Sequence, residues 1–217
     1  MKLFVDSANV EAIEVLLPLR IIDGITTNPS LLARETGNPR DTLKRICEAV
    51  GGPVSAEVVA TDVEEMVREG RELAAIDNHI VVKVPFGKSG VSACAALASE
   101  GIRVNVTLVF SPAQALLAAK VGATYVSPFV GRLDDIATDG MELVSQILEI
   151  YENYEFVTEV LVASVRGPAH VVEAARMGAD ICTCPPKVIE ALFGHPLTEI
   201  GLEKFLADWE RSKTDRA

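Results

Sequence analysis

The chain has 217 residues, of which 49% are hydrophobic, and it carries a formal net charge of −11 at pH 7. A chain of this size can bury one large core, and its acidity opposes nonspecific binding to nucleic acid or to an anionic membrane surface. No apolar run approaches the roughly 20 residues of a membrane-spanning helix, and Asp6 interrupts the early apolar run that a secretory signal requires. These features predict a soluble, cytoplasmic protein with a single domain over residues 1–217.

Short β-branched runs alternate with amphipathic segments along almost the whole chain. Intervening segments such as 63–75 and 112–121 carry apolar residues at helical spacing. The eight predicted strands are residues 3–7, 24–27, 54–59, 80–84, 104–108, 125–129, 156–163 and 180–183. Eight such units favour a closed (β/α)8 TIM barrel. The alternative is an open doubly wound sheet, but Ser7-Ala8-Asn9 follows the first strand, where a dinucleotide site would have spaced glycines.

An additional helix is predicted at about residues 199–212, after the eighth unit. Leu202, Phe205, Leu206 and Trp209 fall on one face of this helix. An apolar face with aromatic residues needs a surface to cover. We expect that surface to belong either to the barrel itself or to a neighbouring subunit.

The cysteines and histidines do not form a metal-binding pattern. Cys47, Cys94, Cys182 and Cys184 lie among apolar or small residues, as is typical of reduced, buried thiols in a cytoplasmic protein. The three histidines are not at ligand spacing from these cysteines or from each other. The sequence therefore predicts neither a metal site nor a bound cofactor.

Polar residues gather at the predicted strand ends, which line a shared mouth in a barrel of this kind. Residues at or just after those ends are Asp6, Thr27, Asn28, Glu57, Lys83, Asn105, Thr107, Ser127, Phe129, Arg132, Ser164 and Arg166.

Lys83 lies among apolar strand residues, so its side chain faces either the barrel interior or the helix layer. Desolvation there favours the neutral amine, which attacks carbonyls; the alternative is a lysine that extends to solvent or pairs with a carboxylate. Asp6 and Glu57 are candidate acid–base groups for a Schiff-base enzyme, although each alone could be a structural partner. An acidic protein that binds phosphate must gather arginines, and Arg132 and Arg166 meet this demand unless they form only surface salt bridges.

Six segments resemble those of the small transaldolases and the related fructose-6-phosphate aldolases. The resemblance covers essentially the whole chain. The segments are Asp6, Gly24-Ile25-Thr26-Thr27-Asn28-Pro29-Ser30, Val82-Lys83-Val84-Pro85, Asn105-Val106-Thr107-Leu108-Val109-Phe110-Ser111, Ser127-Pro128-Phe129-Val130-Gly131-Arg132 and Ala163-Ser164-Val165-Arg166.

The resemblance implies a metal-free Schiff-base mechanism in the pentose phosphate pathway. Lys83 would condense with the ketone of sedoheptulose 7-phosphate or fructose 6-phosphate, and the dihydroxyacetone unit would pass to glyceraldehyde 3-phosphate or erythrose 4-phosphate. Asp6 would take the proton of the C4 hydroxyl, and Glu57 would act through a water held by Thr107. The resemblance also implies pentamers that pair into decamers. Sugar contacts are expected from Thr27, Asn28, Asn105, Ser127 and Phe129, and phosphate contacts from Arg132, Ser164 and Arg166.

Residues at two positions distinguish the transaldolases from the fructose-6-phosphate aldolases. The aldolase branch has glutamine and tyrosine where this chain has Glu57 and Phe129, which favours transfer of dihydroxyacetone over its release. A fructose-6-phosphate aldolase is the nearest alternative, and a noncatalytic sugar-phosphate-binding protein is a more distant one. The segment Phe86-Gly87-Lys88-Ser89-Gly90 departs from the family, which has an acidic residue before the glycine.

Overall fold

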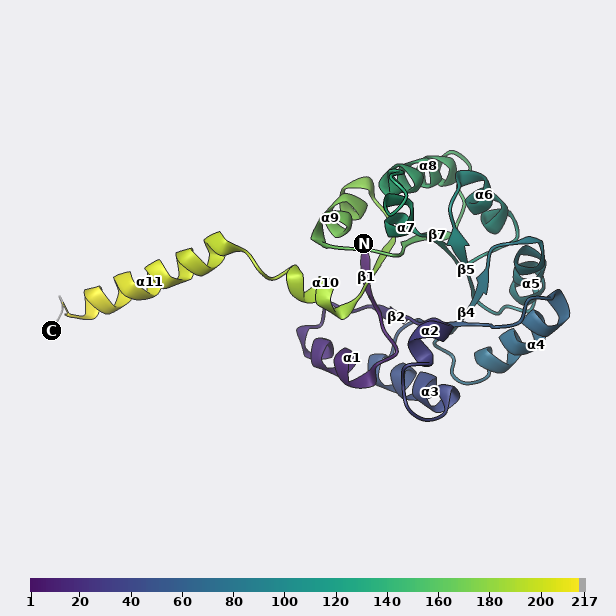
Figure 1. The fold of residues 1–217 in the computed structure, drawn as a ribbon, viewed down its shortest axis with the longest axis horizontal. Helices are drawn as coiled ribbons and strands as arrows, with labels where there is room; N and C mark the ends of the chain where they lie inside the picture. The colour runs from purple at the N-terminus through teal and green to yellow at the C-terminus, as the bar shows by residue number, and fades with distance from the viewer. Residues whose placement is uncertain (215–217) are drawn as a thin grey trace.

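A computed structural model describes residues 1–214 and shows eight parallel strands closed into a barrel, with helices around the outside (Figure 1). Neighbouring strands pair in chain order, and β8 closes the barrel against β1. The predicted (β/α)8 barrel with an additional C-terminal helix is confirmed, whereas the single-domain organisation remains a prediction. The strands are β1 (Lys2–Asp6), β2 (Gly24–Thr26), β3 (Val54–Glu57), β4 (Ile80–Pro85), β5 (Val104–Val109), β6 (Tyr125–Pro128), β7 (Glu159–Val162) and β8 (Ile181–Cys184).

The helices begin at local signals that the sequence carries. At the start of α6, for example, Ser111 Oγ accepts a hydrogen bond from the Gln114 backbone, and Pro112 is the first helical residue. The predicted helices at 63–75 and 112–121 agree with α4 and α6 to within one residue. The helices are α1 (Val10–Leu16), the short 3₁₀ helix η1 (Leu17–Leu19), α2 (Pro29–Leu32), α3 (Pro39–Val50), α4 (Val63–Ala74), α5 (Lys88–Ser99), α6 (Pro112–Lys120), α7 (Val130–Asp134), α8 (Gly140–Asn153), α9 (Pro168–Met177), α10 (Pro186–Ala191) and α11 (Pro196–Thr214).

The buried apolar residues form two clusters. The larger cluster lies between the strands and the surrounding helices, whereas the smaller one fills the barrel interior. The interior cluster contains Phe4, Val81, Tyr125, Leu161 and Ile181, among others. Successive side chains of a strand point to opposite faces, so residues two positions further along these strands also face the interior. This alternation decides which polar side chains reach the mouth.

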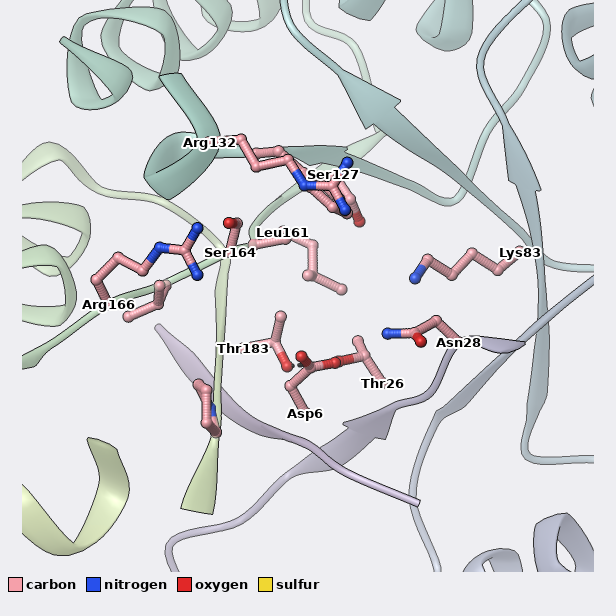
Figure 2. Close-up of a pocket in the computed structure, with 14 residues that line it drawn as sticks. Asp6, Thr26, Asn28, Lys83, Ser127, Arg132, Leu161, Ser164, Arg166 and Thr183 are labelled. Atoms are coloured by element: carbon pink, nitrogen blue, oxygen red, sulfur yellow. Dashed lines mark hydrogen bonds between the residues drawn. The ribbon is translucent and has the colours of Figure 1, made fainter. Parts of the chain in front are cut away.

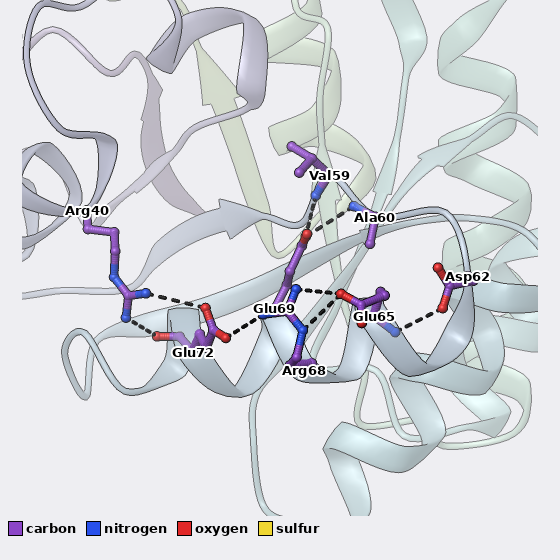
Figure 3. A network of polar contacts seen from close by, with 8 residues as sticks. All are labelled: Arg40, Val59, Ala60, Asp62, Glu65, Arg68, Glu69 and Glu72. Atoms are coloured by element: carbon purple, nitrogen blue, oxygen red, sulfur yellow. Dashed lines mark hydrogen bonds and ion pairs between the residues drawn. The ribbon is translucent and has the colours of Figure 1, made fainter.

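Two predicted strands are longer than the observed ones by two residues or more. Residues 156–158 do not join β7, because Phe156 packs edge-on against Tyr151 of α8 and the Thr158 hydroxyl donates to the Ala123 carbonyl. β3 ends before Val59 and Ala60, whose backbone N–H groups donate to the Glu69 carboxylate of α4 at 2.8 and 3.1 Å (Figure 3). Tertiary contacts at both places replace hydrogen bonds of the sheet.

All four cysteines are free and buried. Burial raises the pKa of the Cys47 and Cys94 thiols to about 12, so both are protonated and unreactive at neutral pH, as expected of residues that fill the core. Within residues 1–214, no three His, Cys, Asp or Glu side chains are grouped to hold a metal ion. No helix of this range is both long enough and apolar enough to cross a bilayer.

Helix α11 extends away from the barrel (Figure 1). It is longer at both ends than the predicted 199–212. None of its described residues is buried, and its apolar side chains include Phe205 and Trp209, which are 72% and 57% exposed. The described chain therefore leaves this apolar surface uncovered.

Candidate active site

Lys83 lies inside the barrel. It is two residues beyond Val81 of the interior cluster and only 5% exposed, so the choice between interior and helix layer is settled in favour of the interior. Its Nζ atom is 3.1 Å from Glu57 Oε2 and donates to the Thr27 carbonyl at 3.2 Å. The register of β3 against β4 pairs Glu57 directly with Lys83, which explains why the two side chains meet.

Thr107 and Glu57 border one cavity beside Lys83. The Thr107 hydroxyl is the one buried side-chain polar atom of residues 1–214 that has no hydrogen-bond partner. The β5–β6 register shifts between Val106 and Val109, and Leu108 has a φ of 58° in this irregularity. Such a backbone is strained for a non-glycine residue, and strain of this kind often accompanies function. A buried hydroxyl with a free bonding capacity next to a carboxylate suits an ordered water.

Asp6 follows Phe4 on the interior face of β1. Its Oδ1 atom accepts a hydrogen bond from the Thr26 hydroxyl at 2.8 Å, and Thr26 Oγ1 lies 2.7 Å from Thr183 Oγ1. Burial raises the pKa of Asp6, while the Thr26 hydrogen bond and the positive charge of Lys83 act in the opposite direction. A carboxyl whose pKa is raised binds a proton more readily, which suits a group that must accept and return one.

Three predicted sugar-binding residues lie at different depths. Asn105 is fully buried; its amide nitrogen donates to Ser55 Oγ, and its oxygen accepts from Ser127 Oγ. The Asn28 oxygen caps α2 by accepting from the Leu31 N–H, which leaves its amide nitrogen for the cavity. Thr27 turns its hydroxyl away to the Ser55 carbonyl, and its own carbonyl is the group that contacts Lys83.

Ser164 and Arg166 reach the mouth because α7 begins against the segment that follows β7. The Val130 and Gly131 N–H groups donate to the carbonyls of Ala163 and Ser164, each at 3.1 Å. A Cβ on Gly131 would lie 2.1 Å from the Ser164 carbonyl oxygen, so only glycine permits this approach. Ser164 itself has a φ of 62°. This contact holds the two predicted arginine segments together at one corner.

The two arginines of this corner are exposed and differ in their partners. Arg166 Nη2 lies 2.6 Å from Asp135 Oδ2, with side chains 54% and 59% exposed. The Arg132 guanidinium lies over the Phe129 ring, 5.3 Å from its centroid. Among residues 1–214, Arg132 has no carboxylate within salt-bridge distance. The two guanidinium groups therefore lie at one place, as expected of a phosphate site, and Arg166 also forms the kind of exposed salt bridge that the alternative predicted.

Two cavities meet at Lys83. One of about 310 Å³ includes Lys83 and both arginines (Figure 2), and the other, of about 370 Å³, includes Lys83, Glu57 and Thr107. Of the predicted site residues, Thr27 and Asn105 line neither cavity; the first gives a carbonyl to Lys83 and the second supports Ser127. The predicted residues that line one or both are Asp6, Asn28, Glu57, Lys83, Thr107, Ser127, Phe129, Arg132, Ser164 and Arg166.

The sequence prediction missed Thr26 and Thr183, which line the first cavity. Both are buried threonines in the strands that flank β1. Alternation could have indicated Thr26, because Asn28 faces the cavity two residues later. The strand-end rule could have indicated Thr183, which closes the predicted strand 180–183, whereas its contact with Thr26 depends on how β8 and β2 flank β1.

Comparisons with known proteins identify the family of the chain. A model of the Transaldolase/Fructose-6-phosphate aldolase family matches residues 3–216. A probable transaldolase of Syntrophobacter fumaroxidans is 58% identical over the full length of both chains. Probable transaldolases of Aquifex aeolicus and Nitrosopumilus maritimus are 59% and 56% identical, over 97% and 99% of this chain and 97% of each relative. The chain therefore belongs to the transaldolase/fructose-6-phosphate aldolase family.

Proposed function

We propose that the protein is a transaldolase, in which Lys83 forms a Schiff base with a ketose phosphate and passes a dihydroxyacetone unit to an aldose phosphate. The observation that carries this proposal is the position of Lys83, a buried amine where two cavities meet, with Glu57 at 3.1 Å and Asp6 across the first cavity. An amine needs nearby acid–base groups to lose carbinolamine water and to cleave a carbon–carbon bond.

The reaction begins when the Lys83 amine attacks the C2 ketone. Glu57, through a water at the unpartnered Thr107 hydroxyl, moves the protons that release water and form the imine. Asp6 then removes the proton of the C4 hydroxyl, the C3–C4 bond breaks, and its electrons pass into the imine to give an enamine. The departing aldehyde leaves, and an acceptor aldose phosphate reverses the same steps.

The exposed corner binds the phosphate in this proposal. Arg132, Ser164 and Arg166 line the first cavity beside Lys83, so a ketose phosphate can reach the amine and the two guanidinium groups together. Asn28 and Ser127 line the same cavity and hold the sugar hydroxyls. Thr27 and Asn105 act from behind it, through Lys83 and Ser127 respectively.

Transfer is favoured over release because of Phe129. This residue lines both cavities, and its ring has no group that could donate a proton or hold a water. Without such a donor the enamine persists until an aldehyde arrives. Glu57 supports the same choice, since the aldolase branch has glutamine there.

An assay of free dihydroxyacetone tests this choice. Fructose 6-phosphate is incubated with and without erythrose 4-phosphate, and both sedoheptulose 7-phosphate and free dihydroxyacetone are measured. A transaldolase forms the seven-carbon product and releases little dihydroxyacetone without an acceptor. Equal or faster release without an acceptor would favour an aldolase. We also propose, from the family resemblance, that these sugars are the physiological substrates in the pentose phosphate pathway. The early Asp6 and the free, buried cysteines support a cytoplasmic location.

We further propose that α11 packs on a neighbouring copy of the chain in a pentamer or decamer. Two observations support this. The exposed apolar side chains of α11 lie together on one helix rather than singly over the surface, and the resemblance implies such an assembly. Deleting residues 202–217 should lower the number of subunits in the assembly, measured by light scattering or native mass spectrometry. Phe205→Glu and Trp209→Glu should act alike, whereas Val172→Glu, at an exposed position on α9, should not. A monomeric full-length chain would contradict the proposal.

A further inference from the structure

Thr183 is linked through Thr26 to Asp6, the candidate base of the carbon–carbon cleavage. It is 2% exposed, lies two residues beyond Ile181 of the interior cluster, and lines the same cavity as Asp6. Its hydroxyl lies 2.7 Å from that of Thr26, which in turn donates to Asp6 Oδ1 at 2.8 Å (Figure 2). Three adjacent strands, β8, β1 and β2, thus supply a short chain of polar groups.

The number of available hydrogens decides which group donates in each of these hydrogen bonds. A hydroxyl has one hydrogen to donate, and an ionised carboxylate can only accept. When Asp6 is ionised, the hydrogen of Thr26 points to Asp6, so the hydrogen between the two threonines must come from Thr183. The remaining Asp6 oxygen, Oδ2, has no hydrogen-bond partner within residues 1–214, and Asp6 borders the cavity. One carboxylate oxygen is therefore anchored, and the other is available to a substrate hydroxyl.

We propose that Thr183 is a positioning residue for the cleavage step, which directs the Thr26 hydroxyl onto Asp6 and thereby stabilises the ionised, proton-accepting carboxylate. The inference rests on the proposed function, because it assigns Asp6 the role of base toward the C4 hydroxyl. Hydrogen bonds in a chain polarise one another in a buried site, so the donor from Thr183 strengthens the bond from Thr26 to the charged carboxylate.

Other charged groups near Asp6 do not fully offset burial, because the pKa of Asp6 is still raised. Lys83 across the cavity favours the ionised form, and Arg132 and Arg166 border the same cavity further out. On the opposite side, contact with Cys182 and burial raise the pKa of Cys184, so that its thiol is neutral and adds no charge beside Asp6. The groups that favour ionisation oppose the burial that raises the pKa of Asp6.

The test is the pH dependence of kcat/KM for fructose 6-phosphate with an acceptor. Its acid limb reports the ionisation of the free enzyme's base. Thr26→Val removes the charge-assisted bond and should shift that limb upward by about one to two pH units. Thr183→Val removes only the polarising donor and should shift it upward by roughly 0.1–0.6 of a pH unit. The double variant should match Thr26→Val, because Thr183 acts through Thr26.

Further variants separate positioning from packing. Thr183→Ser keeps the hydroxyl, so its acid limb should lie at the wild-type pH. Thr183→Ala removes the hydroxyl without adding bulk and should reproduce the shift of Thr183→Val. Thr158→Val removes another buried threonine hydroxyl, one that donates only to the Ala123 carbonyl, and should leave the limb unmoved. Borohydride trapping of dihydroxyacetone on Lys83 needs no C3–C4 cleavage, so it should persist in every variant.

The outcomes distinguish the two levels of the proposal. Wild-type protein that is neither trapped nor able to transfer would contradict the proposed function, and the role of Thr183 would fall with it. Wild-type protein that is trapped and transfers, with Thr183→Val and Thr183→Ala both at the wild-type limb, would contradict the role of Thr183 alone. Additive shifts in the double variant would also overturn it, since they would mean that Thr183 acts without Thr26.

Discussion

Lys83, Glu57 and Asp6 lie in far drier surroundings at the barrel mouth than Arg132 and Arg166. We call the first group the dry side of the site and the second group the wet side. The Lys83 and Glu57 side chains are 6% and 13% exposed, whereas the Arg166 and Asp135 side chains are 54% and 59% exposed. Charge interactions in a buried environment are several times stronger than those in contact with water and salt. In the proposed mechanism the dry side carries the proton transfers, and the wet side binds the phosphate.

The backbone reflects the same difference. The groups on the dry side project from strands, where Asp6 and Lys83 follow Phe4 and Val81 of the interior cluster. The groups on the wet side come from segments that follow strands, held by the close approach of Gly131 to Ser164. Chemistry that needs fixed distances is placed on rigid elements, and binding is placed on connections. Substitutions on the two sides should consequently differ in both size and kind.

The largest effect is expected on the dry side, from Lys83→Ala. The variant has no amine for the ketone, so transfer and covalent trapping should both fall below detection. Wild-type protein treated with fructose 6-phosphate and borohydride should gain the mass of a reduced dihydroxyacetone adduct on Lys83, measured by peptide mass spectrometry. Lys88→Ala, at the exposed start of α5, is the matched control and should retain adduct and activity. An adduct on Lys88 in wild type would refute the assignment.

Phe129 borders both sides, and Phe129→Tyr should give the next largest effect. The new hydroxyl can hold a water beside the enamine, and a well-placed general acid typically contributes about 10²–10⁴-fold. Release of dihydroxyacetone without an acceptor should therefore rise while transfer falls, and adding Glu57→Gln should extend the change. Phe110→Tyr is the control, because Phe110 packs edge-on against Phe129 but lines neither cavity. A tyrosine variant without any increase would show that Phe129 does not decide between transfer and release.

The arginines of the wet side should affect binding more than chemistry. Arg132→Ala and Arg166→Ala each remove a charge-assisted contact of about 1.5–3 kcal/mol, so KM for fructose 6-phosphate should rise roughly tenfold or more. KM for unphosphorylated fructose should change little, and Arg176→Ala on the exposed face of α9 should change neither constant. Steady-state kinetics with both sugars provides the measurement. Equal weakening for the two sugars would place the phosphate elsewhere.

The sequence predicted the dry side better than the wet side. Strand periodicity and polar strand ends were sufficient to place Asp6, Glu57 and Lys83 at one mouth, because strand ends converge in a closed barrel. Thr27 was predicted to contact substrate, yet its neighbour Thr26 faces the cavity. A shift of one residue reverses the face of a strand, and a three-residue strand such as β2 offers too little pattern to fix it.

The contacts of the wet side depend on tertiary structure. Arg132 and Arg166 were predicted as a pair, but no sequence pattern indicated that Asp135, the residue after α7, would contact Arg166. That pairing follows from the close packing of α7 on the Ser164 segment, which depends on Gly131. Residues 156–158 left the predicted strand for a similar reason, since the Thr158 hydroxyl donates to the carbonyl of Ala123, which is distant in sequence, and this contact overrides local β-propensity. Contacts between segments distant in sequence therefore account for most of what was missed.

The smallest effect should come from Asp135→Asn, which tests how strongly water and salt weaken the charge interactions of Arg166. An incoming phosphate must compete with Asp135 for the Arg166 guanidinium, with which Asp135 Oδ2 makes a 2.6 Å contact. Exposed ion pairs are worth so little that losing this competitor should lower KM for fructose 6-phosphate by only roughly 1.4- to 5-fold. The gain should shrink as salt is added, because salt screens exposed charges. Glu100→Gln, which breaks the similarly exposed contact between Arg71 and Glu100, should leave KM unchanged at every salt concentration. If Asp135→Asn instead raises KM, Asp135 holds Arg166 ready for phosphate rather than competing with it, and this corner is as preorganised as the buried side.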